Sequence, residues 1–382
     1  LTSNDVMNHR KEPLDDEFFR DVRSVAEAVQ VIFHTPIPKE LAEMLPFRML
    51  KNSMKRDKNA LERRIRVCFE YADDDFLYVT PVDEVSDENW KIRYNQLGVN
   101  DEFTEGIKEY WRHAQLNLLD VKRNEDGTYT PSFIVLEPDY LVDISALAEC
   151  YREYGSHPAN YIMSRLVPID NARPLLLGNI ANLFLDEWIY ASEEEPEYLD
   201  CMKKVFKRYP IELAACEELL DKEKETAFFK DCQMHFEHIR QTVKDTFLEP
   251  GYNLDKSDAV LEPSYICEAL GVQGRLDYMQ RDMSSFIEMK SGKADEYAMK
   301  GKLEPKENNR VQMLLYMAVL EYSMGIDRRK QHPYLLYTRY PLLYPARASW
   351  AQVRRIIALR NRIVAAEYGT QMHNHPSYTA EL

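Results

Sequence analysis

The sequence predicts a mixed α/β fold, in which a mixed sheet flanked by helices follows a small β-barrel and an N-terminal helical arm. Three patterns lead to this prediction. Apolar residues recur at helical spacing over residues 14–54, strand-like alternation dominates residues 64–140, and a hairpin followed by an apolar helix occupies residues 274–325. We therefore expect three domains, at residues 1–59, 60–140 and 141–382.

The composition is typical of a globular protein and limits the possible functions. Hydrophobic residues make up 45% and charged residues 30% of the 382 residues. No run of 18 apolar residues and no signal peptide is present, so we expect no membrane contact. The scattered cysteines indicate a reducing cytoplasm, and we expect a monomer. The net charge of −15 argues against a general nucleic-acid binder, although it does not exclude a local basic channel.

The expected barrel is built from short strands separated by turn signals. A short helix at about residues 102–112 interrupts the strands, which is typical of an OB-like barrel. A basic cluster at residues 51–66 precedes it, and this cluster either meets a phosphate backbone or forms a solvated helix face. The expected strands lie at residues 64–71, 76–81, 115–123 and 129–138.

The hairpin at residues 274–293 contains the candidate functional residues. In its second strand, the period of two places Glu288 and Lys290 on the same face. Gly274 before the first strand and Lys293 after the second form a small rim with positive charge, which suits a phosphate chain. A surface hairpin with solvated charges is the alternative interpretation.

Two carboxylates face each other across this hairpin. A turn centred on Asp282 and Met283 places Asp277 opposite Glu288, with Cβ atoms roughly 5 Å apart. Carboxylates this close repel each other unless a cation lies between them, and Mg²⁺ or Mn²⁺ with oxygen ligands suits such a position. The pattern of an Asp followed by Glu-x-Lys therefore indicates a metal-dependent nuclease site.

The next helix supplies two further candidates. Residues 308–325 are apolar almost all round, so we expect a buried helix. Gln312 and Tyr316 lie one turn apart on one of its faces. A buried glutamine side chain needs hydrogen-bond partners, so Gln312 is expected to face other polar groups.

These residues together resemble a known nuclease pattern. Gly274-Arg275-Leu276-Asp277, Glu288-Met289-Lys290 and the Gln312-x-x-x-Tyr316 helix resemble, in order, the motifs of the RecB-like branch of the PD-(D/E)xK superfamily. Within that branch, residues 288–293 and 335–369 are most similar to the nuclease domain of the helicase-nuclease family that trims Okazaki flaps.

The resemblance implies a restriction-endonuclease-like sheet, a DNA-enclosing barrel and a metal-dependent deoxyribonuclease that acts on single-stranded or flapped DNA in replication or repair. It implies that Asp277, Glu288 and the Met289 backbone carbonyl bind Mg²⁺ or Mn²⁺. Lys290 would then orient the attacking water. The expected catalytic residues are Asp277, Glu288, Lys290, Gln312 and Tyr316, the last two of which either brace the site or contact the DNA.

Further positions follow from the resemblance. Asn182 stands where many members of the branch have a metal-ligating His, and Asp186 or Glu187 would compensate for the weaker amide ligand. Glu262 is either a further acidic site residue or a surface carboxylate. The expected DNA contacts are Arg275, Lys293 and Arg310.

The cysteines do not support the iron-sulfur cluster that relatives of this type often contain. Cys150 stands at the position of the upstream ligand, but no cysteine follows Cys267 and a standard cluster needs four thiolates. Either this lineage lacks the cluster or its ligands lie beyond Leu382, and a buried helix cysteine is the alternative role of Cys150. The six cysteines are Cys68, Cys150, Cys201, Cys216, Cys232 and Cys267.

Two rival functions remain open from the sequence. A catalytically silent DNA-binding or scaffold module with a nuclease fold is suggested by Asn182 and the acidic net charge. A nuclease of another branch, acting in recombination or CRISPR adaptation, is disfavoured by the barrel and by the helix with Arg360 and Asn361. Because no G-x-x-x-x-G-K-[ST] loop is present and the chain begins at Leu1 without Met, we expect a helicase motor elsewhere in a longer polypeptide.

Overall fold

The computed structural model describes most of the chain after residue 61 and part of residues 22–41. It divides into two compact units, Leu1–Ala60 and Leu61–Leu382. In the first unit the described residues from 22 to 33 are helical, in agreement with the expected arm, whereas residues 51–61 of the basic cluster lie outside the described residues. The described ranges of the second unit are 62–82, 89–152, 155–167, 173–191, 194–252, 254–297, 302–347 and 349–369.

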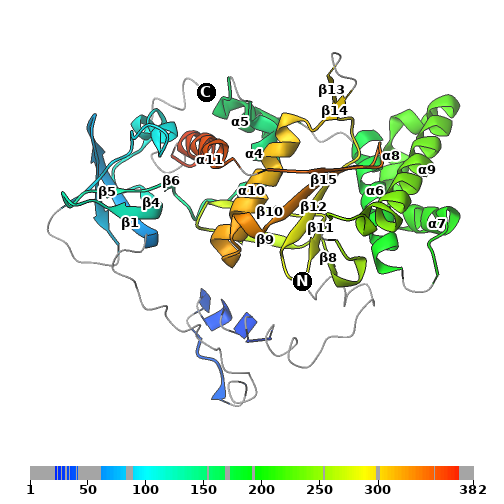
Figure 1. Cartoon of the computed structure of the whole chain (residues 1–382), viewed down its shortest axis with the longest axis horizontal. Helices are drawn as coiled ribbons and strands as arrows, with labels where there is room; N and C mark the ends of the chain where they lie inside the picture. Colours follow the sequence, from blue (N-terminus) through cyan, green and yellow to red (C-terminus); the bar gives the residue numbers. More distant parts are fainter. Residues whose placement is uncertain are drawn as a thin grey trace. The chain divides into compact units, whose positions relative to one another are not determined.

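A five-stranded barrel begins the second unit (Figure 1, left). Hydrogen bonds link its strands in the closed order β1-β2-β3-β5-β4-β1, and β6 extends the sheet on β4. The pairing of β3 with β5 is parallel and the others are antiparallel. The predicted barrel is therefore confirmed. The five strands of the barrel are β1 (Glu62–Ala72), β2 (Leu77–Pro81), β3 (Trp90–Ile92), β4 (Gln115–Arg123) and β5 (Tyr129–Thr130), and the additional strand is β6 (Phe133–Leu136).

The helix expected within the barrel is replaced by two 3₁₀ turns, η1 (Asp101–Phe103) and η2 (Gly106–Glu109). Phe103 and Ile107 anchor them in the core, at 1% and 3% exposure. Burial of these two side chains, rather than a continuous amphipathic face, therefore shapes the segment.

The second sheet is mixed and is covered by helices on both faces (Figure 1). Phe286 packs in the cluster that contains α10 (Glu307–Met324), whereas Ile287 and Met289 pack in the cluster that contains α6 (Arg173–Tyr190) and α9 (Lys222–Lys244). The predicted alternation of side chains between the two faces of β12 is therefore confirmed. The strand order is β16 (Leu342–Pro345), β15 (His332–Tyr337), β12 (Ser285–Lys290), β11 (Tyr278–Gln280) and β8 (Ala259–Leu261), with β12 and β15 parallel.

The predicted hairpin register is confirmed, but its first strand is not continuous. Tyr278 pairs with Ile287, as a turn at residues 282 and 283 requires. The preceding residues instead form β10 (Val272–Arg275), which pairs with β9 (Ser264–Cys267) and β7 (Val142–Asp143) in a separate sheet. The chain changes sheets at Leu276, whose amide donates to the Pro263 carbonyl at 3.0 Å.

The remaining helices differ in detail from the expectations. Residues 195–248 combine Lys, Glu and apolar residues at helical spacing, which predicts two helices. The structure has three α-helices there, because Pro210 begins a short additional one. The sequence pattern also predicts a helix over residues 143–154, whereas the observed helix ends at Cys150. Among the described helices, none is both long and apolar enough to cross a membrane. The bounds of the helices not yet given are α4 (Ile144–Cys150), α5 (Pro158–Leu166), α7 (Tyr198–Arg208) and α8 (Pro210–Ala215).

The last helix, α11 (Trp350–Val364), fastens the barrel to the rest of the unit. The Ser-x-x-Gln spacing at Ser349 predicts a capping box, and this prediction is wrong. The arginines of the helix are predicted to lie on its surface, which holds for Arg355 but is wrong for Arg354 and Arg360. The Ser349 side chain makes no capping hydrogen bond. Arg360 is fully buried, because the fold places its guanidinium among main-chain carbonyls.

The buried guanidinium joins three segments. It donates to the carbonyls of Leu136, Glu137 and Tyr140 at the end of β6, and to that of Gly271 beside β10. Gly271 has a φ of +63°, and a Cβ there would collide with the guanidinium. Burial lowers the pKa of Arg360 to about 9. Strand β6 and the loop before β10 are thus held by one cation.

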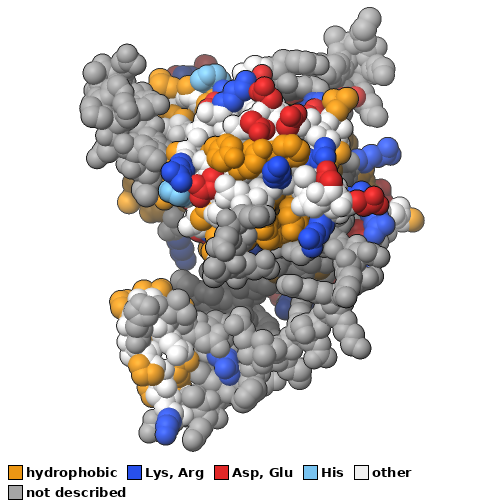
Figure 2. All heavy atoms as spheres, turned by 90° about the vertical axis from the view of Figure 1, so that its left-hand side faces the viewer, with side chains coloured by type: hydrophobic (Ala, Val, Ile, Leu, Met, Phe, Trp, Pro, Cys, Tyr) orange, Lys and Arg blue, Asp and Glu red, His pale blue; other side chains and the backbone are white. Residues whose placement is uncertain are grey.

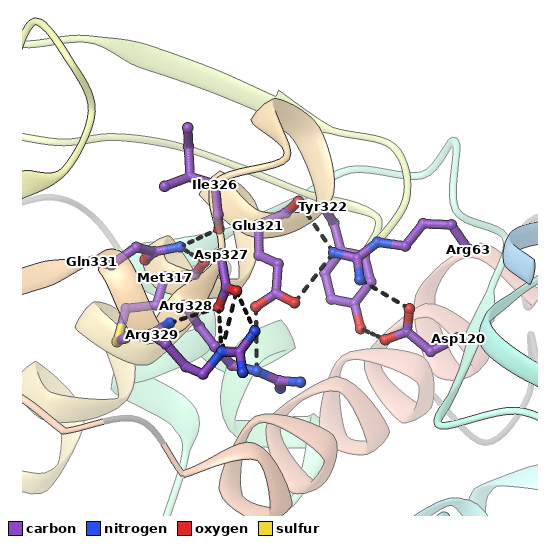
Figure 3. Close-up of polar contacts among 10 residues, drawn as sticks. All are labelled: Arg63, Asp120, Met317, Glu321, Tyr322, Ile326, Asp327, Arg328, Arg329 and Gln331. Carbon is purple, nitrogen blue, oxygen red and sulfur yellow. Dashed lines mark hydrogen bonds and ion pairs between the residues drawn. The ribbon is translucent and has the colours of Figure 1, made fainter. Parts of the chain in front are cut away.

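A second contact links the barrel to α10 (Figure 3). Arg63 on β1 bonds Asp120 on β4 at 3.1 Å and Glu321 on α10 at 3.2 Å. Its guanidinium lies 4.6 Å from the Tyr322 ring centroid, and the Tyr322 hydroxyl donates to Asp120 at 2.6 Å. Arg63, a member of the expected basic cluster, is therefore engaged within the protein.

The visible surface shows no single basic face on the side displayed in Figure 2. There, Lys and Arg side chains of the second unit are interspersed with Asp and Glu. Arg66 of the basic cluster follows the same pattern, because it pairs with Asp139 and bonds Asn117 at 3.1 Å. Arg63 and Arg66, the described arginines of the cluster considered so far, are thus bonded to acidic groups of the same unit.

The Arg360→Ala substitution should destabilise the second unit by about 3 kcal/mol or more, because it leaves buried carbonyls without donors. Urea unfolding followed by fluorescence measures the change. The matched control is Arg355→Ala on the exposed side of the same helix, which should change stability by less than about 0.5 kcal/mol. Equal stability of the two variants would contradict a stabilising role for the buried Arg360 guanidinium.

Candidate active site

Asp277 lies where the chain passes from the small sheet to the main sheet. It directly precedes β11, and its Oδ2 accepts a hydrogen bond from the Met289 amide at 2.6 Å. The register of β11 and β12 places it opposite Glu288. The amide of Glu262 donates to the Asp277 carbonyl at 3.1 Å, so the main chain on both sides of the residue is held.

Glu288, Lys290 and Gln312 form a closed hydrogen-bonded triangle. Glu288 Oε1 accepts from Lys290 Nζ at 2.9 Å and from Gln312 Nε2 at 2.6 Å. Lys290 Nζ also donates to Gln312 Oε1 at 2.8 Å. The glutamine on α10 therefore has the polar partners that its burial required, and β12 is tied to α10.

The two carboxylate oxygens of Glu288 differ in their hydrogen bonding, because only Oε1 has donors among the described residues. Glu288 is 4% exposed, and among the described residues its Oε2 has no hydrogen-bond partner. Burial and then the charge of Asp277 raise the pKa of Glu288 to about 8, although Lys290 acts in the opposite direction. Burial also raises the pKa of Asp277. Two acids are thus held in a site that disfavours their simultaneous ionisation.

Lys290 remains a cation in this setting. Burial alone would lower its pKa, but the charges of Glu288 and Asp277 outweigh that effect, so its pKa is raised. Its side chain is 25% exposed. The ammonium group therefore contacts Glu288 and Gln312, while part of the side chain is open to solvent.

The Tyr316 side chain lies against Gly274 so closely that a larger residue would not fit there. The Tyr316 hydroxyl donates to the Arg275 carbonyl at 2.7 Å, and the side chain is fully buried. A Cβ at Gly274 would lie 2.9 Å from that hydroxyl and 3.0 Å from Ile144 Cδ1. Close approach of α10 to β10 thus requires a glycine, and the burial of Tyr316 fits the bracing role.

Ser145 belongs to the site but was not predicted. Its Oγ accepts from Gln312 Nε2 at 3.0 Å, and the helix that positions it is capped by Asp143, which accepts from the Ala146 amide at 2.9 Å. On the same helix, Glu149 accepts from Asn308 at 2.7 Å. Nothing in the local pattern identified Ser145, because 167 positions separate it from Gln312.

The three basic residues expected to contact DNA lie on the surface, away from the hydrogen-bonded triangle of Glu288, Lys290 and Gln312. Arg275 is exposed and its guanidinium is 3.5 Å from Glu262, whose charge also raises the pKa of Asp277. Lys293 and Arg310 are exposed. None of these three basic side chains is joined to Glu288 or Gln312 by a contact among the described residues.

The metal-ligand expectations beyond the two carboxylates have less support. Asn182 is half-buried on α6, and Glu187 is paired with Lys204 at 2.5 Å. The contact made by the Met289 main chain is through its amide. Among the described residues, no three His, Cys, Asp or Glu side chains gather as a metal site would require. The six cysteines are free, and all except Cys68 are buried.

The raised pKa of Glu288 predicts that stability without metal falls as pH rises from about 4.5 to about 8. In this window the folded protein keeps a proton on Glu288 that the unfolded chain releases, so unfolding becomes easier with increasing pH. Urea midpoints measured in EDTA between pH 5 and pH 8 test this. Glu288→Gln should flatten the profile, and identical slopes would contradict the assignment.

Gly274→Ala should destabilise the fold by about 1–3 kcal/mol, because the new methyl group meets the Tyr316 hydroxyl and Ile144. Thermal melting measures the loss. The control is Gly292→Ala, where a Cβ would meet no atom within 4 Å. Similar melting temperatures for the two variants would exclude the close approach.

Comparison with protein-family models found no match, and a search of curated proteins found no significant relative. The resemblance noted from the motifs therefore stays an expectation. The geometry of Asp277, Glu288, Lys290 and Gln312 is the observation that bears on function.

Proposed function

We propose that this chain is a divalent-metal-dependent deoxyribonuclease that acts on single-stranded or flapped DNA, as part of a larger helicase-nuclease in replication or repair. The main support is the placement of a half-buried Asp277 and a buried Glu288 beside a partly exposed Lys290. A purely structural sheet gains nothing from opposed acids withdrawn from solvent, because like charges at close range raise the cost of ionisation.

The donor set fits Mg²⁺ or Mn²⁺. Both ions prefer oxygen ligands, and Glu288 presents a buried Oε2 without a hydrogen-bond donor among the described residues. Asp277 and Glu288 would hold the ion, and the Met289 carbonyl is the proposed third ligand. When bound, such an ion supplies a water of lowered pKa and polarises a phosphoryl oxygen.

Lys290 is the proposed catalytic cation. Its Nζ is held at 2.9 Å from Glu288 and 2.8 Å from Gln312, so the ammonium has little freedom before substrate arrives. A preorganised cation stabilises negative charge that develops on a phosphoryl oxygen at low reorganisation cost. Gln312 and Tyr316 position this group: the first by direct contact, the second by bracing α10 against β10.

A catalytically silent nucleic-acid-binding or scaffold module is the second candidate. A specific observation favours it: among the described residues, no three metal-binding side chains converge, and Asn182 stands where the nuclease pattern has a His. In this case the Lys290 to Glu288 ion pair would serve stability alone. The two candidates differ in whether Lys290 affects a chemical step.

The decisive experiment combines cleavage and binding. Labelled single-stranded DNA is incubated with the full chain in Mn²⁺ or EDTA, and we expect cleavage with Mn²⁺ only. Lys290→Ala should slow single-turnover cleavage by about 100-fold or more, because it removes charge stabilisation in the transition state.

The affinity of Lys290→Ala for DNA should change little at the same salt concentration. The control is Lys293→Ala, an exposed lysine beyond the strand, which should retain the wild-type cleavage rate at saturating DNA. A binding defect with a normal cleavage rate in Lys290→Ala would rule out the catalytic role of Lys290. A wild-type chain that binds DNA without cleaving it would favour the scaffold, and metal-independent cleavage would refute the metal site.

A further inference from the structure

The orientation of the Gln312 amide follows from its neighbours. An ammonium group has donors only, so Lys290 must face the Gln312 carbonyl oxygen, at 2.8 Å. The amide nitrogen then faces Glu288 Oε1 at 2.6 Å and Ser145 Oγ at 3.0 Å. Both amide hydrogens are therefore donated, one to each oxygen.

This arrangement assigns the hydrogen-bonding state of Ser145. Because Gln312 is the donor, the Ser145 hydroxyl acts as the acceptor and keeps its own hydrogen free for another bond. Among the described residues, no hydrogen bond is donated by this hydroxyl. Ser145 is exposed, whereas Glu288 at the other side of the amide is 4% exposed. The network thus ends in an accessible donor.

The group that would use this donor is an anion with several oxygens. The Lys290 ammonium and the Ser145 hydroxyl contact the two ends of one amide group, so a cation and a neutral donor lie close together. Phosphate oxygens bind to such pairs of lysine and hydroxyl groups. The two acids of this helix are engaged by other donors, since Glu149 accepts from Asn308 at 2.7 Å and the capping Asp143 accepts from the Ala146 amide at 2.9 Å.

We propose that the Ser145 hydroxyl donates a hydrogen bond to a non-bridging phosphate oxygen of the DNA backbone. The inference rests on the proposed function for the identity of the anion. Ser145 is then a substrate-contacting residue contributed by α4, from outside the hairpin and the glutamine helix.

Ser145→Ala should weaken the affinity for a labelled single-stranded oligonucleotide by about tenfold, because one hydrogen bond to a charged oxygen is lost. Affinity is measured by fluorescence anisotropy in a Glu288→Gln background, which prevents consumption of the DNA. In the otherwise wild-type chain, the rate should fall about tenfold at low DNA concentration and recover at saturation, because the contact exists before and during the reaction.

Two variants control this experiment. Ser145→Thr keeps the hydroxyl and should restore the affinity to within about threefold of the wild type. Ser164→Ala removes an exposed hydroxyl on α5 that donates to the Tyr161 carbonyl at 2.7 Å, and it should leave binding and cleavage unchanged.

The outcomes separate this inference from the proposed function. Unchanged affinity in Ser145→Ala would overturn the inference, as would a slower rate at saturation with unchanged affinity, because Ser145 would then only support Gln312. A wild-type chain that binds without cleaving, together with a tenfold loss in Ser145→Ala, would support the phosphate contact and overturn the nuclease assignment.

Discussion

The burial of Glu288 is the constraint on which the site depends. A carboxylate that is 4% exposed needs partners for its charge, and Lys290 and Gln312 meet at one of its oxygens. The hydrogen bonds of Gln312 to Glu288 and Lys290 fix the position of α10 against β12. The second amide hydrogen of Gln312 bonds Ser145 and so fixes the position of α4. Three elements distant in sequence are therefore aligned around one acid.

Helix α10 also connects the site to the barrel. Gln312 and Tyr316 near its start contact the site residues, whereas Glu321 and Tyr322 near its end meet Arg63 and Asp120 of the barrel. Helix α11 adds a second attachment through Arg360. The barrel is thus fastened at two places, and both attachments use an arginine whose partners come from separate segments. Both arginines therefore set the orientation of the barrel against the rest of the second unit, and Arg360 also stabilises it by donating to buried carbonyl groups.

Much of the site could be predicted because its pattern is local. Alternation along β12 predicted which side chains share a face, and a two-residue turn predicted that Asp277 is opposite Glu288. The apolar helix predicted a buried Gln312. The change of sheet at Leu276 could not be predicted in this way. It depends on hydrogen bonds from Leu276 to the Pro263 carbonyl and from the Glu262 amide to Asp277, and the spacing of residues within the hairpin does not indicate such contacts.

The sequence by itself determined the alternating strands, the register of the hairpin and the order of barrel, sheet and helices, because these depend on periodicities within short windows. Only the tertiary structure decided that Arg360 is buried rather than on the surface, that Ser145 joins the site, and that Gly274 admits Tyr316. The physical reason is that burial and hydrogen bonding of a polar side chain depend on groups supplied by distant segments. Their chemistry is visible in the chain, but their proximity is not.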